Sequence, residues 1–376
     1  MMRHPQQRRR RSWLHELGHG LKVLCLLILF WFAIGSIVLA AEPTATLKAV
    51  LLDASQFDEV RAATLRLADF NAVVLRVESN RESSKREIAR AFAVAQRHQL
   101  PCYFWIEVAR CPTLADKRPE LMASLQGHPE WRRFFPQAPQ ASDNEVVKTY
   151  PWVPIMSREG FDAQLARVTK LLEGLPAPDG LFLNDLQGAP SACGCGHPLC
   201  RWTTDYGPKR TNEKLGHEAA AQFVAAVAKA SHVPRVIPVW VTECEAHDKT
   251  TLCAGVGCYE GLCWKEFVRQ LTPLAERSEP IALLLPFREF ERDLPIYPDR
   301  AGWIREAVEL MQTQPRRHRG TPVPPERLIT VLQGWDVTHR EVMAQIAQSQ
   351  LAGASGFIVS LVPIDQSWEP RIMPLK

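Results

Sequence analysis

After residue 43 the chain alternates strictly between short apolar runs and amphipathic segments, and this alternation constrains its fold more than any other feature. Eight runs rich in β-branched and aromatic residues are typical of strands: Leu47–Asp53, Ala72–Val77, Cys102–Val108, Gly180–Leu186, Val236–Thr242, Ile281–Phe287, Leu328–Gln333 and Gly356–Leu361. Between them, seven segments repeat apolar residues at helical spacing: Gln56–Leu67, Ser84–His98, Arg158–Leu175, Glu213–Ala230, Trp264–Ala275, Ala301–Gln312 and Glu341–Leu351. Near-continuous apolar strands separated by amphipathic helices indicate a parallel sheet covered by helices.

Eight such units predict that residues 42–376 form one closed (β/α)8 barrel of the TIM type. No eighth helix is visible in residues 362–376, which contain three prolines. The alternative is an open doubly wound sheet. A dinucleotide-binding version of that sheet needs a glycine-rich turn after the first strand, and Asp53–Gln56 contains no glycine. The closed barrel is therefore the favoured architecture.

The loops that leave the third, fourth and fifth strands are much longer than the few residues usual between such elements. By contrast, the loop that enters the third strand spans only residues 98–101. In (β/α)8 barrels the loops that follow the strands carry the active site, and those that precede them mainly stabilise the fold. Any active site is therefore expected at the mouth formed by the long loops.

Residues 1–41 are expected to form a targeting segment that lies outside the barrel. Arginines at positions 3 and 8–11 and Lys22 precede an uncharged apolar run, Val23–Ala41, with the small residues Val38 and Ala40 near its end. A basic start, an apolar centre and a small-residue exit are typical of a secretory signal peptide, and a run of roughly 20 residues also suits a transmembrane helix. Either alternative exports the barrel to a periplasmic or other extracytoplasmic space.

The net charge of +4 does not indicate nucleic-acid binding. The net positive charge belongs to the targeting segment, and the remainder of the chain is close to neutral. No basic stripe with interleaved aromatic residues remains to follow a phosphate backbone.

Carboxylates follow most of the predicted strands: Asp53, Glu78, Glu107, Asp185, Glu243, Glu289, Asp336 and Asp365. Cleavage of a glycosidic bond needs two carboxyl groups on opposite sides of the sugar, and neighbouring strand ends can supply them. We predict Asp185 and Glu243, after the fourth and fifth strands, as the catalytic pair, with Glu107 after the third as a further candidate. Leu181, Leu183 and Asp185 are every second residue of this strand, so their side chains share a face. The structural alternative is that acidic residues here only cap the following helices.

Tryptophans are frequent at strand ends and in the exit loops. Flat aromatic faces bind sugars because the C–H face of a pyranose buries apolar area against them. We therefore predict a group of substrate contacts that also includes the asparagine beside Asp185: Trp105, Trp131, Trp152, Trp202, Asn184 and Trp335. The structural alternative is that the tryptophans fasten the long loops to the barrel.

The loops after strands four and five are rich in cysteine: Cys193, Cys195, Cys200, Cys244, Cys253, Cys258 and Cys263. In an oxidising compartment such cysteines favour disulfides that staple the loops. The alternative is a zinc site, because four Cys or Cys/His ligands on short spacings bind zinc tetrahedrally and His197 lies nearby. No C-x-x-C-H motif is present, which excludes a c-type haem attachment.

The segment from Asp179 to Asp185, D-G-L-F-L-N-D, is followed by a C-x-C-x4-C segment and Arg201. This combination resembles the glycoside-hydrolase-like barrels of bacteria, over roughly residues 150–205. The resemblance implies a carbohydrate-active fold in which Asp185 is the strand-four acidic residue. An α-amylase-like arrangement would make Asp185 the nucleophile and Glu243 the acid/base.

The leading hypothesis is an exported, glycoside-hydrolase-like barrel that acts on a polysaccharide or glycoconjugate and needs no cofactor. The first alternative is a carbohydrate-binding barrel without catalysis. The second is a metal-binding or disulfide-stapled barrel without hydrolase activity, in which the cysteines hold zinc. The expected partners are a carbohydrate and, if the N-terminal helix is not cleaved, a membrane.

Overall fold

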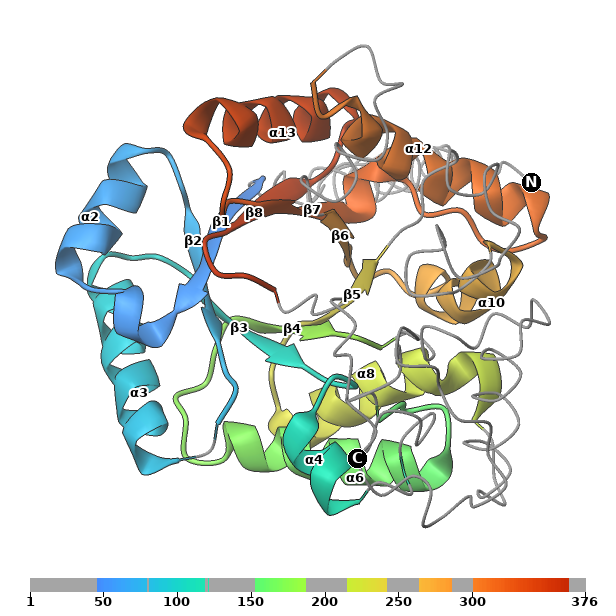
Figure 1. Ribbon diagram of the computed structural model, residues 1–376, viewed down its shortest axis with the longest axis horizontal. Coiled ribbons are helices and arrows are strands. Elements are labelled where there is room, and N and C mark those ends of the chain that lie inside the picture. Colours follow the sequence, from blue (N-terminus) through green and yellow to red (C-terminus); the bar gives the residue numbers. More distant parts are fainter. Residues whose placement is uncertain are drawn as a thin grey trace, which may run out of the picture. The chain divides into compact units, whose positions relative to one another are not determined.

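The computed structural model describes residues 46–79, 81–118, 121, 153–186, 215–241, 264–285 and 300–364. Eight parallel strands close into a barrel in sequence order, with β8 paired to β1. Helices surround the strands (Figure 1). The predicted (β/α)8 barrel is confirmed. The open doubly wound sheet is excluded, because such a sheet would leave β1 and β8 unpaired with each other.

The strands are β1 (Leu47–Asp53), β2 (Ala72–Arg76), β3 (Cys102–Glu107), β4 (Gly180–Asn184), β5 (Val236–Val241), β6 (Ile281–Leu285), β7 (Leu328–Gln333) and β8 (Gly356–Ser360). The α-helices are α2 (Glu59–Leu67), α3 (Glu82–Arg97), α4 (Pro112–Lys117), α6 (Arg158–Leu172), α8 (Ala219–Ser231), α10 (Trp264–Ala275), α12 (Gly302–Arg317) and α13 (His339–Leu351). Short 3-10 helices are η1 (Ala54–Gln56), η4 (Gly216–Glu218) and η6 (Pro325–Arg327). All eight strands begin where the sequence predicted, and among the α-helices of the described residues only α4 was not anticipated.

Polar side chains mark the start of several helices. At the start of α13, the Thr338 side chain accepts a hydrogen bond from the Glu341 backbone N–H, and the Glu341 side chain accepts one from the Thr338 backbone N–H. Ser157 likewise accepts from the Gly160 backbone N–H at the start of α6. These bonds satisfy N–H groups that have no partner within the helix.

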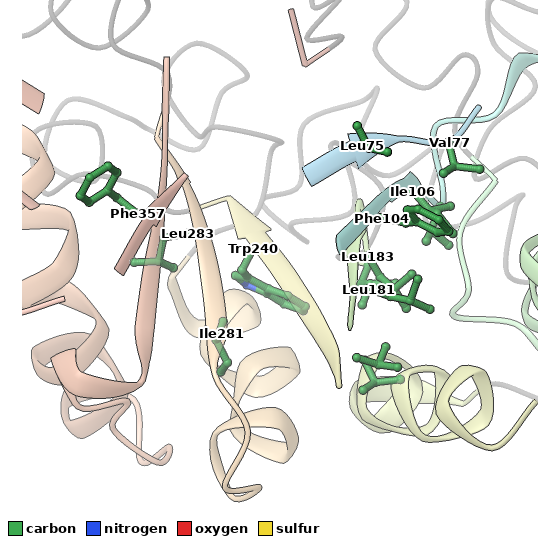
Figure 2. Packing of buried hydrophobic residues seen from close by; sticks show 14 of the residues in the cluster. Leu75, Val77, Phe104, Ile106, Leu181, Leu183, Trp240, Ile281, Leu283 and Phe357 are labelled. Carbon is green, nitrogen blue, oxygen red and sulfur yellow. The ribbon is translucent and has the colours of Figure 1, made fainter. Parts of the chain in front are cut away.

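Alternate residues of each strand face two different apolar layers. The outer layer packs the strands against the helices and includes Phe104, Leu181, Leu183 and Trp240 (Figure 2). The inner layer fills the barrel with side chains from the strands: Ala49, Leu51, Val74, Tyr103, Trp105, Phe182, Val239, Leu284, Val331 and Ile358. The barrel is therefore a packed core, and a ligand can enter only at its ends.

The chain that follows β8 turns across the carboxyl-terminal mouth of the barrel. Val362 and Ile364 are buried in the inner layer, and the Leu361 backbone N–H donates to the Leu51 carbonyl. We call residues 361–364 the closing segment. It covers the mouth beside β1 and β8. Residues 365–376, where an eighth helix would have to form, lie outside the described residues.

The chain divides into two units, Met1–Thr46 and Leu47–Lys376. The predicted signal peptide or anchor in residues 1–41 lies outside the described residues and stays a prediction. In the part of the chain that the structure describes, no helix combines the length and apolar character needed to cross a membrane.

Candidate active site

Polar side chains occupy the last inward-facing position of six strands at the carboxyl-terminal mouth: Asp53, Arg76, Glu107, Asn184, Gln333 and Ser360. Strand register brings them together in pairs. Asp53 lies opposite Arg76, Glu107 opposite Asn184, and Gln333 opposite Ser360. Nearer the amino ends of the strands, the inward faces are apolar. Among the described inward-facing strand residues, the polar groups therefore lie at the mouth.

Glu107 is held between two neutral donors. The Trp105 indole N–H donates to its Oε1 at 2.7 Å, and the Asn184 Nδ2 amide donates to its Oε2 at 2.7 Å. Trp105 is itself fully buried and stacks on Phe182, with ring centroids 6.1 Å apart. The buried Trp105 ring and Asn184 on the next strand therefore fix the orientation of the carboxylate.

The remaining polar atom of Asn184 lacks a protein partner. Asn184 is fully buried, and its Oδ1 accepts no hydrogen bond within the described part of the chain. The amide orientation follows from chemistry, because only the NH2 group can donate to the Glu107 carboxylate. A buried acceptor without a donor is costly, and such atoms in native proteins call for an explanation.

Arg76 is the centre of a second polar group at the mouth. Its guanidinium donates to both oxygens of Asp53, at 2.8 and 3.1 Å, and its Nε lies 3.1 Å from Glu78 Oε1. Its Nη1 donates to the Pro363 carbonyl of the closing segment at 3.0 Å. Burial lowers the pKa of Arg76, but the hydrogen bond to Asp53 and the charges of Glu78, Asp53 and Glu107 outweigh it, so the net shift is upward.

A second arginine holds the backbone at the end of β3. Arg167 on α6 donates to the backbone carbonyls of Glu107 and Val108 and to the side chain of Gln164. Burial lowers the pKa of Arg167, and the nearby Cys111 and Glu107 act in the opposite direction. The end of β3 is therefore held at its backbone by α6 and at the Glu107 side chain by Trp105 and Asn184.

Asp185, the residue after β4, has a different environment from Glu107. It is fully buried, its backbone is left-handed with φ of 60°, and Arg110 Nη2 donates to its Oδ1 at 3.2 Å. Leu181 and Leu183, which have the same parity along the strand as Asp185, pack in the outer layer against the helices. The inward position at this strand end belongs to Asn184.

The other predicted substrate contacts differ in their exposure. Trp335 is partly buried at the mouth against the inner layer, whereas Trp105 has no exposed face. The remaining predicted site residues lie outside the described residues: Glu243, Trp131, Trp152, Trp202, and the cysteines at 193, 195, 200, 244, 253, 258 and 263. Their roles, including disulfides or zinc, stay predictions. Cys102 and Cys111 are buried free thiols, and the described residues contain no cluster suited to a metal ion.

Sequence reasoning did not single out Arg76, Arg110 or Arg167. All three pair with strand-end residues, but arginines inside or after apolar runs give no sequence signal for the partner that they find in space. Arg76 shares its strand face with Ala72 and Val74, but Val73 and Leu75 make the opposite face equally apolar, so alternation alone does not show that Arg76 points inward.

Comparison with known proteins finds distant structural similarity only. No protein-family model matches this chain, and no curated protein matches its sequence. An endo-1,4-β-D-mannanase from Thermotoga petrophila is 9% identical with a TM-score of 0.44, over 84% of this chain and 88% of that one. A chitinase from Chromobacterium violaceum is 9% identical with a TM-score of 0.41, over 87% and 98% of the two chains.

Similar structures also include a protein of another reaction class. An HpcH/HpaI aldolase from Desulfitobacterium hafniense is 11% identical with a TM-score of 0.31, over 84% of this chain and 86% of that one. The structurally similar proteins thus include a mannanase and a chitinase as well as an aldolase, and at these identities and TM-scores the likeness carries no conclusion about function.

Proposed function

We propose that this protein is a carbohydrate-active barrel of the glycoside-hydrolase type, and that Glu107 is the carboxylate that acts on the substrate. The observation that carries the proposal is the hydrogen-bonded pair of Glu107 and Asn184 on the inward faces of adjacent strand ends. This pair presents a fixed carboxylate beside an amide oxygen that has no partner in the described structure. Hydroxyl groups of a sugar can donate to both.

The hydrogen bonds of Glu107 favour one of the two carboxylate roles in glycoside cleavage. Both of its oxygens already accept N–H bonds, so the group is arranged as an acceptor. In this role Glu107 would attack or stabilise the anomeric carbon as the bond to the leaving oxygen breaks. A second carboxyl group must give its proton to that oxygen, and water then completes the hydrolysis.

Glu243 is the proposed proton donor. Val239, four residues earlier on β5, packs inside the barrel, and β5 is a parallel neighbour of β4. A strand that continued with the same alternation would bring residue 243 to the mouth. Asp185, by contrast, is proposed as a positioning residue that fixes Arg110 behind the site. Trp335 would offer a flat apolar surface for a sugar ring.

The proposed location is extracytoplasmic, and it rests on the sequence of residues 1–41. A carbohydrate polymer or glycoconjugate outside the cytoplasm would be the matching substrate. No metal or organic cofactor is required by the carboxylate chemistry proposed for this mouth.

The test compares three variants of the full chain on a broad panel of glycans. Glu107→Gln is expected to lower kcat by roughly 10²–10⁴-fold, because the amide can neither attack nor exchange protons. Glu173→Gln, the same change at an exposed residue beyond α6, is the control and should leave kcat unchanged. Thermal unfolding of each variant shows whether the fold is retained.

Asp185→Asn separates the two assignments of the acting carboxylate. A positioning residue predicts a smaller loss of kcat than Glu107→Gln. If Glu107→Gln keeps full activity while Asp185→Asn abolishes it, Asp185 is the acting group and the proposed assignment fails. Binding of glycans without cleavage of any would instead indicate a carbohydrate-binding barrel.

A further inference from the structure

The described side chains at the mouth have placed their hydrogen-bond donors against protein acceptors. Trp105 and Asn184 donate to Glu107, Gln333 Nε2 donates to the Trp335 carbonyl, and Ser360 Oγ donates to the Val362 carbonyl. Each of these bonds uses one donor of its group. Among the described residues, the polar atoms that stay unoccupied beside them include acceptors.

Arg76 follows the same pattern, although it is a cation. Each of its three guanidinium nitrogens already contacts an acceptor: Nε and Nη2 the Asp53 carboxylate, and Nη1 the Pro363 carbonyl. Glu78 adds a second carboxylate at 3.1 Å and is 61% exposed toward solvent. Among the described side chains, this group and Glu107 together carry one cation and three carboxylates.

The unused acceptors are concentrated at Glu107 and Asn184. A carboxylate has about four lone-pair positions, and Glu107 uses two of them. Asn184 Oδ1 is fully buried and has no partner in the described structure. These adjacent acceptors match a ligand group that donates several hydrogen bonds and carries positive charge, and they repel a ligand carboxylate.

We infer that the mouth selects a saccharide that carries an ammonium group, an amino sugar, over one that carries a carboxylate. The inference rests on the proposed function for the choice of a saccharide, and it specifies the chemical class that this same site takes. The ammonium donates to Glu107 and Asn184 Oδ1 together, and the neighbouring carboxylates of Asp53 and Glu78 favour its charge.

The test is calorimetric binding of three oligosaccharides of equal length to the full chain at about pH 6, where amines of this kind are protonated. The probes are a glucosamine oligomer, its fully N-acetylated counterpart and a galacturonic acid oligomer. We expect the glucosamine oligomer to bind about tenfold tighter than the acetylated one, the effect of one charge-assisted hydrogen bond. The acidic oligomer should bind most weakly, and the differences should shrink at about 1 M salt.

Two variants locate the selectivity. Glu107→Gln should reduce the preference for the amine at least severalfold, whereas the control Glu173→Gln should leave it intact. Equal or tighter binding of the acidic oligomer, or no binding of the glucosamine oligomer, would overturn the inference, and both results come from the unmodified protein. The calorimetric experiment measures binding alone, and the glycan panel measures cleavage, so the inference and the proposed function fail separately. Amine selectivity without cleavage removes only the latter, and cleavage of neutral glycans without selectivity removes only the former.

Discussion

At the scale of single residues, the two carboxylates at the ends of β3 and β4 lie in opposite environments. Glu107 faces the inside of the barrel and accepts from two neutral donors. Asp185 is fully buried, has a left-handed backbone and pairs with the guanidinium of Arg110. A non-glycine residue persists in that conformation only where its surroundings hold it there. Glu107 is thus the partly exposed carboxylate of the two, and Asp185 is the buried one that pairs with a cation.

Replacing Asp185 by Ala should lower the free energy of unfolding by about 3–5 kcal/mol, because it breaks the buried ion pair with Arg110. Urea denaturation measures the loss. The same substitution in an Arg110→Ala background should cost clearly less, since the two residues are coupled. Equal costs in both backgrounds would show that the ion pair contributes nothing.

At the scale of elements, β7 and α13 are joined by one buried side chain. Gln345 on α13 accepts a hydrogen bond from the Gln333 backbone N–H and donates one to the Gln333 carbonyl. Both groups lie at the end of β7, where Gln333 also reaches the mouth. The helix therefore fixes the last residue of the strand in the way that a neighbouring strand would.

Gln345→Leu should destabilise the protein by roughly 2 kcal/mol or more, because it leaves two buried backbone groups without this partner. Gln350→Leu, an exposed glutamine on the same helix, is the matched control and should change stability by less than about 0.5 kcal/mol. Hydrogen exchange at the Gln333 amide should accelerate only in the first variant. An unchanged exchange rate would contradict the bridge.

The extent of the elements shows what local sequence predicts and what packing adds. Every strand end agrees with its prediction to within two residues, because each apolar run ends at a polar residue or a turn. By contrast, α12 continues through Pro315 to Arg317, beyond the predicted end at Gln312. Burial of Met311, Gln314 and Pro315 against neighbouring elements stabilises this last turn despite the proline.

At the scale of the whole molecule, the barrel depends on the contact between its first and last strands. Gly356 starts β8 beside Leu47, and a Cβ at position 356 would lie 2.6 Å from the Leu47 carbonyl oxygen and 2.7 Å from its Cβ. Only glycine allows this approach without movement of the backbone. The close approach of β1 and β8 that closes the barrel therefore depends on glycine at position 356.

Gly356→Ala should reduce the free energy of unfolding by about 1–3 kcal/mol, the usual cost of overpacking a close contact. Guanidinium denaturation followed by circular dichroism measures the change, and the m-value should stay constant if the barrel remains closed. An unaltered midpoint would mean that β1 and β8 can separate slightly at no cost.

The sequence by itself determined the order and number of the strands and their bounds to within two residues, and hence the closed barrel. It could not determine which face of each strand points inward. Parallel strands in a barrel are apolar on both faces, so alternation shows which residues lie together but not on which side. Only the tertiary structure placed Glu107 and Asn184 inside, Leu181 and Leu183 outside, and Arg76 between its carboxylates, because those positions depend on how the whole sheet closes.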